Sequence, residues 1–141
     1  VKLKRQKPEF KNLRYKEILR HLKKLDNSRA DIGLCSNNKI FETGTSNLLF
    51  VKNDKVFSPI NKFYKGITYK FFRSKIKKII KKDILVNSLK EFDEIILIGS
   101  GKGVASVKTI NQIKWKRKNL KFYNILSRHY KSAISNCKRY S

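Results

Sequence analysis

Short apolar runs alternate with turn-forming residues over residues 30–58, and this pattern predicts a meander of short antiparallel strands. The runs are closed by Asn37-Asn38, by Asn53-Asp54 and by Ser58-Pro59, which are residue types that favour turns or stop strands. The expected strands are residues 30–36, 39–43, 48–52 and 56–57. A longer apolar run, residues 95–98, predicts a buried strand, and residues 83–86 and 104–108 are expected to be shorter strands.

Apolar residues at helical spacing predict three amphipathic helices. They are expected from about Lys11 to Asp26, from Ile67 through Lys82, and from Phe122 to Ile134, with a single helical turn at residues 89–92. The apolar stripe of the second helix is suited to a core contact, and its basic residues also suit a membrane surface or a partner. Together the elements predict one α+β domain over residues 10–141, preceded by a lead-in strand or linker at residues 1–9.

Glu42 occupies an unusual place for a charge, between the apolar runs of two expected strands. Strands disfavour Glu mildly in general and strongly where they are buried. Two interpretations follow: the carboxylate faces water in a hairpin, or it serves a bound positive group.

Two glycine-containing segments are candidate anion sites. Gly66-Ile67-Thr68 leads into a helix, whose first N–H groups and dipole favour a phosphate, although an ordinary helix start has the same pattern. Residues 99–103 follow the buried strand, but Lys102 is followed by Gly103 rather than Ser or Thr, which excludes a Walker loop. Val104 stands where a dinucleotide fingerprint needs glycine. The remaining interpretation is a loop that can bind an anion through its backbone N–H groups and the Ser100 hydroxyl.

The composition is strongly basic, with 35 Lys and Arg against 10 Asp and Glu in 141 residues and a net charge of +25. Such a charge attracts nucleic acid or an anionic surface, and Trp115 within the basic segment 114–118 offers a ring that could stack on a base. Coding bias toward A and T, which enriches Lys, Ile and Asn, explains the same composition without a partner. A basic nucleic-acid-binding module is therefore an alternative of a different class.

Cys35 and Cys137 lie far apart and no CxxC or matching His spacing occurs, so we expect free thiols and no metal. No leader and no apolar run of about 20 residues is present, which predicts a soluble, cytoplasmic protein without a membrane partner. The sequence begins at Val1 and contains no Met, so we expect it to be a piece of a longer chain.

Several segments, taken in order, resemble the large C-terminal domain of the class IV aminotransferases. This family of pyridoxal-phosphate enzymes of fold type IV includes branched-chain and D-amino-acid aminotransferases and aminodeoxychorismate lyase. The segments are Glu42-Thr43-Gly44-Thr45-Ser46-Asn47-Leu48-Leu49-Phe50-Val51, Ser58-Pro59, Gly66-Ile67-Thr68, Asp93-Glu94 and Gly99-Ser100. The resemblance covers about residues 10–135 and implies the D-amino-acid aminotransferase-like fold.

The resemblance assigns roles to particular residues. Lys11 precedes Glu42 by about one helix and one strand, as the family's Schiff-base lysine does, and would be the nucleophile and the base that moves the α-proton. Glu42 would keep the cofactor's ring nitrogen protonated. The phosphate would rest on Ile67, Thr68 and Ser100. The substrate side would be formed by Thr45, Ser46, Gly101 and Lys102.

Departures from the family pattern affect what is implied. The small N-terminal domain, which supplies a phosphate-binding arginine, is absent from these residues. Lys102 stands where members carry a small residue, and we expect it to replace that cation in part. Ser106 stands where many members have proline, and Tyr15 is one position out of register with the aminotransferase tyrosine. The register of Tyr15, together with the Lys-x-Leu-x-x pattern of residues 11–15, favours an aminodeoxychorismate lyase, which releases pyruvate through an external aldimine. Branched-chain or D-amino-acid transamination, a homodimer, and a non-catalytic relative that keeps only the fold are the other expectations.

Overall fold

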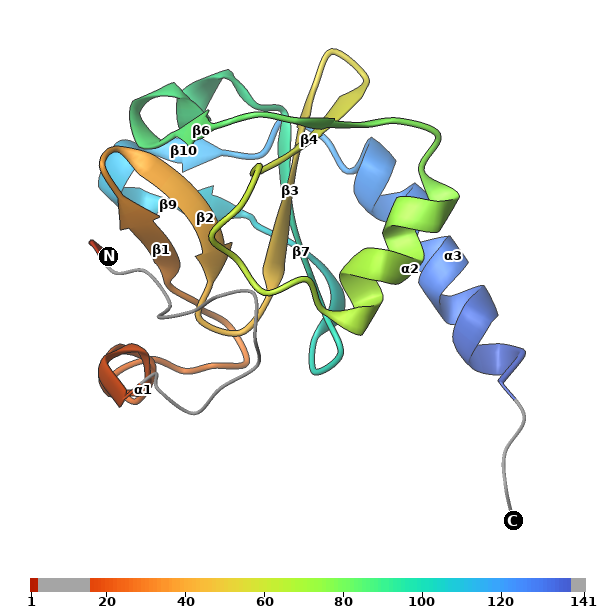
Figure 1. The fold of residues 1–141 in the computed structure, drawn as a ribbon, viewed down its shortest axis with the longest axis horizontal. Coiled ribbons are helices and arrows are strands. Elements are labelled where there is room, and N and C mark those ends of the chain that lie inside the picture. Colours follow the sequence, from red (N-terminus) through yellow and green to blue (C-terminus); the bar gives the residue numbers. More distant parts are fainter. Residues whose placement is uncertain (3–15, 138–141) are drawn as a thin grey trace.

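A five-stranded sheet lies at the centre of the computed structural model, which describes residues 1–2 and 16–137 (Figure 1). Its strand order is β5-β4-β3-β7-β8, and every neighbouring pair is antiparallel except β4 with β5. The strands are β3 (Asn47–Lys52), β4 (Lys55–Ser58), β5 (Ile79–Lys81), β7 (Glu94–Gly99) and β8 (Gly103–Ser106).

Two smaller sheets and the helices surround this sheet. The first small sheet has the order β1-β2-β6 and the second pairs β9 with β10. Their strands are β1 (Gly33–Ser36), β2 (Lys39–Thr43), β6 (Ile84–Leu85), β9 (Thr109–Ile110) and β10 (Trp115–Lys116). The helices are α1 (Lys16–Leu22), α2 (Ile67–Lys75) and α3 (Lys121–Ser135), with the 3₁₀ helices η1 (Val86–Glu91) and η2 (Asn111–Ile113).

Both faces of the central sheet are buried, because apolar residues occupy both sets of alternating positions on β3 and β7. One set, which includes Leu49 and Ile96, packs with Phe72 of α2 and Leu126 of α3. The other set, which includes Phe50, packs with residues of the small sheets. The sheet therefore lies between a helical layer and a layer of small sheets, which confirms the expected α+β class (Figure 1).

The expected strands are confirmed as β1 to β4, and the turns that close their two hairpins have the expected chemistry. The expectation of one continuous meander is wrong, because β2 pairs with β6 and β3 pairs with β7, so the two hairpins belong to different sheets. Asn37 and Asn38 have φ of 51° and 59°, and Asn53 and Asp54 have φ of 50° and 60°. Positive φ at both central residues is typical of the two-residue hairpin turns that match strand twist. Strand β1 begins at Gly33 rather than at residue 30.

The expectation of one helix from Ile67 through Lys82 is wrong for its last residues. Helix α2 ends at Lys75, the next residue is extended, and Ile79–Lys81 is a strand parallel to β4. Hydrogen bonds to the edge of the sheet, together with the β-branched pair Ile79-Ile80, favour the extended backbone there. The first helix ends at Leu22 rather than Asp26, and residues 11–15 lie outside the described residues.

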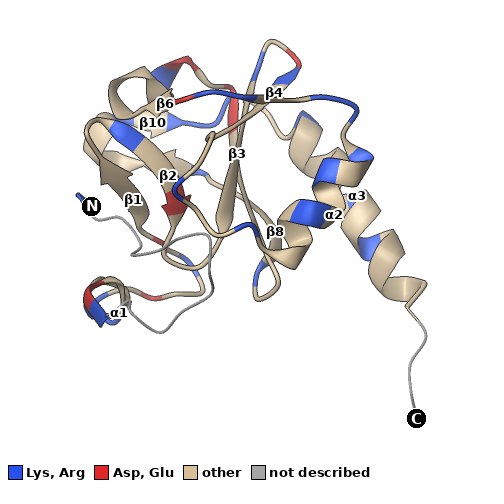
Figure 2. Ribbon diagram, viewed as in Figure 1, with Lys and Arg blue, Asp and Glu red and all other residues tan. Residues whose placement is uncertain are grey.

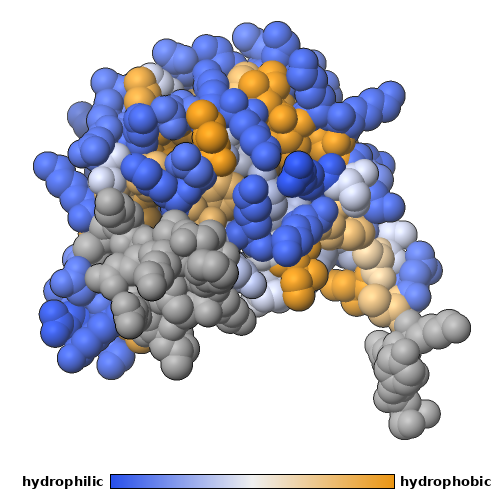
Figure 3. Space-filling model, viewed as in Figure 1, coloured by the Kyte–Doolittle hydropathy of each residue, from blue (hydrophilic) through white to orange (hydrophobic). Residues whose placement is uncertain are grey.

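The basic residues do not gather on one element. Figure 2 shows Lys and Arg on α2, near β4 and on α3, and in Figure 3 hydrophilic residues cover most of the visible face. The suggestion that Trp115 stacks on a base is wrong, because its ring is 4% exposed and its Nε1 donates to the Phe92 carbonyl at 3.0 Å. Within the described residues, no helix has the length and apolar character needed to cross a membrane.

Candidate active site

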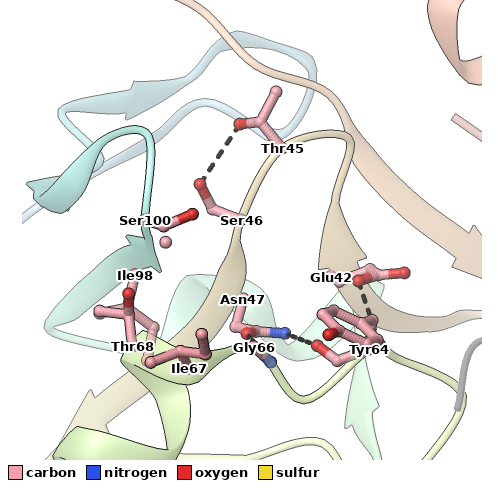
Figure 4. Close-up of a pocket in the computed structure, with 11 residues that line it drawn as sticks. Glu42, Thr45, Ser46, Asn47, Tyr64, Gly66, Ile67, Thr68, Ile98 and Ser100 are labelled. Atoms are coloured by element: carbon pink, nitrogen blue, oxygen red, sulfur yellow. Dashed lines mark hydrogen bonds between the residues drawn. The ribbon is translucent and has the colours of Figure 1, made fainter. Parts of the chain in front are cut away.

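A cavity of about 220 Å³ lies where the β2–β3 turn, the β7–β8 turn and the loop before α2 meet (Figure 4). Three segments that are distant in sequence therefore supply its walls. The lining residues are Glu42, Thr45, Ser46, Asn47, Tyr64, Gly66, Ile67, Thr68, Ile98, Gly99 and Ser100.

The structure brings together six of the site residues predicted from the sequence. Of those predicted for the cofactor or the substrate side, Glu42, Thr45, Ser46, Ile67, Thr68 and Ser100 all line the cavity. Gly101 and Lys102 belong to the same turn as Ser100 but do not line it. Lys11 lies outside the described residues.

Glu42 lies near the end of β2 and lines the cavity next to the loop that carries Tyr64 (Figure 4). The residue is 2% exposed, and its Oε2 accepts a hydrogen bond from the Tyr64 N–H at 3.4 Å. The interpretation of Glu42 as a water-facing hairpin residue is therefore wrong. A buried carboxylate is costly unless charged or hydrogen-bonded groups face it, so its position suits a positive or proton-bearing group.

Asn47 begins β3 and holds the loop that carries Tyr64. Its Nδ2 donates to the Tyr64 carbonyl at 2.6 Å, and its Oδ1 accepts from the Gly66 N–H at 3.2 Å. The residue is 6% exposed. The sequence places Asn47 in the family motif but does not reveal this contact, which joins residues about twenty positions apart.

The start of α2 presents backbone donors to the cavity. Gly66 precedes the helix with an extended backbone, and as a glycine it offers no side-chain acceptor to the first N–H groups of the helix. Thr68, which is 7% exposed, adds a hydroxyl. With the helix dipole, these donors form a suitable place for a phosphate group.

The opposite wall carries hydroxyls from two turns that touch each other. Thr45 Oγ1 lies 3.3 Å from Ser46 Oγ, and Ser100 lies across from Ser46 (Figure 4). A Cβ atom at Gly99 would lie 3.2 Å from Ser46 Oγ and 3.3 Å from the Thr45 carbonyl oxygen. The two turns thus approach closely, and a larger residue at position 99 would separate them.

Lys102 has a partner outside the cavity. Its Nζ lies 3.2 Å from Asp31 Oδ2, and the side chain of Asp31 is only 6% exposed. The sequence does not single out Asp31, because the interaction joins two loops separated by more than half of the chain. Within the described residues, no three His, Cys, Asp or Glu side chains come together as a metal site.

The arrangement combines a buried acid, an uncapped helix start and a wall of hydroxyls around one cavity. A flat ligand with a phosphate at one end and a protonated ring atom at the other matches these groups, because donors face the phosphate and the acid faces the proton. The donor set therefore fits pyridoxal phosphate.

Comparisons with known proteins identify a family. The family model described as class IV amino-transferase matches residues 2–110. No curated protein matches the chain.

Solved structures show the same fold at low sequence identity. The chain is similar to a candidate 4-amino-4-deoxychorismate lyase from Legionella pneumophila (TM-score 0.79, 18% identity, 94% of this chain and 53% of that chain). It is also similar to a candidate branched-chain amino acid aminotransferase from Thermotoga maritima (TM-score 0.74, 21% identity, 96% and 54%). A third is the PLP-bound form of a hypothetical aminotransferase from Mycobacterium tuberculosis (TM-score 0.70, 18% identity, 89% and 48%). The chain spans about half the length of these structures.

Proposed function

Because the chain belongs to the class IV aminotransferase family, we propose that it is the cofactor-binding half of a pyridoxal-phosphate-dependent enzyme. The observation on which this rests is the burial of Glu42, at 2% exposure, in a cavity that also receives the start of α2. When bound, pyridoxal phosphate supplies an electron sink for negative charge at the α-carbon of an amine substrate.

The described residues have distinct tasks in this proposal. The α2 N–H groups, Thr68 and Ser100 bind the phosphate, because they are the donors that the cavity offers to an anion. Glu42 holds the proton on the ring nitrogen, since a carboxylate beside a protonated ring nitrogen favours its charged form. Its burial keeps water from competing for that proton.

Lys11 is proposed as the lysine that holds the cofactor and then moves the proton at the substrate's α-carbon. This assignment rests on its spacing from Glu42 and on the surrounding sequence. Thr45 and Ser46 form the wall on the substrate side, where their hydroxyls can orient the substrate's polar groups.

We propose release of pyruvate from aminodeoxychorismate as the reaction, supported by the register of Tyr15 and by the Lys-x-Leu-x-x pattern of residues 11–15. Transamination of a branched-chain or D-amino acid is the alternative, and similar folds are found among candidate enzymes of both kinds. The family's small domain would supply the rest of the substrate pocket and also an arginine that binds the cofactor phosphate. The complete protein would work as a homodimer. Assays of the complete protein for pyruvate and for keto-acid acceptors separate the two reactions.

A spectrum tests the site. We expect the complete protein with pyridoxal phosphate to show the visible absorbance of a lysine-bound cofactor, and Lys11→Ala to abolish it. Lys16→Ala is the matched control, because Lys16 is an exposed lysine at the start of α1. Glu42→Gln keeps the size of the side chain but removes its charge, so we expect cofactor binding to persist while turnover falls. An unchanged spectrum in Lys11→Ala would remove the lysine assignment.

A further inference from the structure

A buried carboxylate, that of Asp31, connects the segments that form the hydroxyl wall, which consists of Thr45, Ser46 and Ser100. The Asp31 side chain is 6% exposed. Its Oδ1 accepts from the Ile32 N–H at 2.8 Å, and its Oδ2 accepts from Thr43 Oγ1 at 2.8 Å and from Thr45 Oγ1. Lys102 Nζ lies 3.2 Å from the same Oδ2. Both oxygens of Asp31 are thus occupied by donors from three separate segments.

The β2–β3 turn depends on this carboxylate. Thr43 Oγ1 accepts from the Ser46 N–H at 2.9 Å, so the hydroxyl that contacts Asp31 also shapes the turn. The Gly44 N–H donates to the Ile32 carbonyl at 2.9 Å. The segment around Asp31 therefore holds the turn through both its side chain and its backbone.

Lys102 connects the second turn to the same carboxylate. It lies in the β7–β8 turn two residues after Ser100, and its side chain is 24% exposed. A carboxylate as buried as Asp31 pays a large desolvation cost, which a paired cation offsets. The resulting attraction holds the β7–β8 turn against the β2–β3 turn, where a Cβ atom at Gly99 would lie only 3.3 Å or less from Thr45 and Ser46.

The carboxylate also decides the direction of the hydrogen bonds in the wall. An ionised carboxylate only accepts, so the single hydroxyl hydrogen of Thr45 is directed at Asp31. In the 3.3 Å contact between Thr45 Oγ1 and Ser46 Oγ, Ser46 is then the donor. Ser46 lines the cavity and so offers it an oxygen that accepts hydrogen bonds.

We propose that Asp31 and Lys102 form a positioning pair for the substrate-side wall. Asp31 orients the hydroxyls of Thr45 and Ser46, and Lys102 holds the Ser100 turn beside them. The description of the wall as the substrate side rests on the proposed function. The pair itself rests only on the contacts above. Lys102 thus has a structural partner that explains why a long cationic side chain occupies this turn.

Hydrogen exchange tests the connection without cofactor or substrate. Lys102→Met removes the charge and keeps the length of the side chain. We expect the amides of Gly44 and Ser46, which lie in the other turn, to exchange about fivefold faster or more. Lys108→Met is the matched control, because Lys108 is exposed and lies just beyond β8, and we expect it to leave these amides unchanged. Unchanged exchange at Gly44 and Ser46 in Lys102→Met would overturn the proposal.

A double-mutant comparison tests the pair. We expect Asp31→Asn to accelerate the same amides, and Lys102→Met added to it to cause little further change, because the partner is already lost. Additive effects of the two substitutions would contradict a direct pair. If Asp31→Asn does not fold, Thr45→Val takes its place, since it removes the hydroxyl that donates to Asp31 and leaves Lys102 intact. Faster exchange of the Ser46 amide in Thr45→Val supports the proposal, and an unchanged exchange rate opposes it.

Kinetics of the complete protein test the consequence for the site. We expect Lys102→Met to raise KM for the amine substrate about fivefold, while kcat and the affinity for pyridoxal phosphate change by less than about twofold. A fall in kcat with unchanged KM would overturn the positioning role. Failure of the unsubstituted protein to bind pyridoxal phosphate would overturn the proposed function, and the exchange experiment would still decide whether the pair exists.

Discussion

Asn47 illustrates how one side chain of the cavity supports another group, here the start of α2 that we propose to bind the phosphate. Its amide contacts the backbone at both Tyr64 and Gly66, directly before α2. Asn47→Asp keeps the shape but places an acceptor against the Tyr64 carbonyl, so the loop and the helix start should shift. We expect pyridoxal phosphate to bind about tenfold more weakly, in line with a loss of roughly 1–3 kcal/mol for a buried polar group without its partner.

Titration with two cofactor forms checks this prediction. Pyridoxal lacks the phosphate, so its affinity should change much less than that of pyridoxal phosphate if Asn47 acts through the phosphate-binding helix start. Asn124→Asp, at an exposed position on α3, is the control and should change neither affinity. Equal losses for both forms would show that Asn47 supports the domain in general.

At the residue scale, the sequence could identify groups that belong to a continuous motif. Glu42, Thr68 and Ser100 stand beside turn or helix signals, and the cavity brings them together. Asp31 could not be found in this way, because its partners Thr45 and Lys102 come from different loops. Tyr64 contributes through its backbone, which no side-chain pattern reveals.

At the element scale, the strands β1 to β4 were predictable because alternation and turn residues are local signals, whereas their division between two sheets depends on pairing with the distant strands β6 and β7. The extent of α2 was not, because Ile76, Ile79 and Ile80 continue a helical spacing past the true end of the helix. What ends it is a distant partner: the edge of β4 offers backbone hydrogen bonds to β5. The local pattern therefore identified the apolar positions of this segment, but pairing with β4 decided that its backbone is a strand.

Helix α3 gives an element-scale prediction, because its start depends on one buried acid from β7. Glu94 is fully buried, and its two carboxylate oxygens accept from the Phe122 N–H at 2.9 Å and the Tyr123 N–H at 3.0 Å. Glu94→Ala leaves those donors unpaired, so we expect the free energy of unfolding to fall by about 2 kcal/mol or more. Urea denaturation followed by the fluorescence of Trp115 measures this change.

The control for this prediction is Glu17→Ala, which removes an exposed acid from the first turn of α1. We expect it to change the free energy of unfolding by less than about 0.5 kcal/mol. If Glu94→Ala were as mild, the helix start would be stabilised by its packing alone.

At the scale of the whole molecule, the net charge of +25 has an effect that can be located. No Asp or Glu occurs between Asp54 and Asp83, a segment that includes α2 and β5. Within the described residues, no carboxylate forms an ion pair with Lys65, Arg73 or Lys81. The positive charges of Lys65 and Arg73 lower the pKa of Lys81 on the edge strand. Cations from α2, from the loop before it and from β5 therefore repel one another in the folded chain.

The same positive charge is the basis for the alternative of a nucleic-acid-binding module. The burial of Trp115 removes base stacking by that ring as support for it. Composition could not separate a binding surface from coding bias, because both give the same residues. Nucleic-acid affinity that falls steeply with salt and does not respond to Glu42→Gln would favour the binding module. Cofactor affinity that responds to Glu42 and Asn47 but not to nucleic acid would favour the enzyme.

The repulsion around Lys81 gives the last prediction. Its pKa is lower in the folded chain than the ordinary value of 10.5. As the pH rises through the folded-state pKa toward 10.5, the unfolded chain therefore binds more protons at Lys81 and stability rises with pH. Salt screens the same repulsion, so we expect the thermal midpoint to rise with added NaCl. Lys81→Glu should raise the midpoint at low salt and weaken its salt dependence more than Lys108→Glu, a substitution of the same charge at another exposed position. Equal effects of the two substitutions would mean that total charge, rather than the cluster on α2 and β5, governs stability.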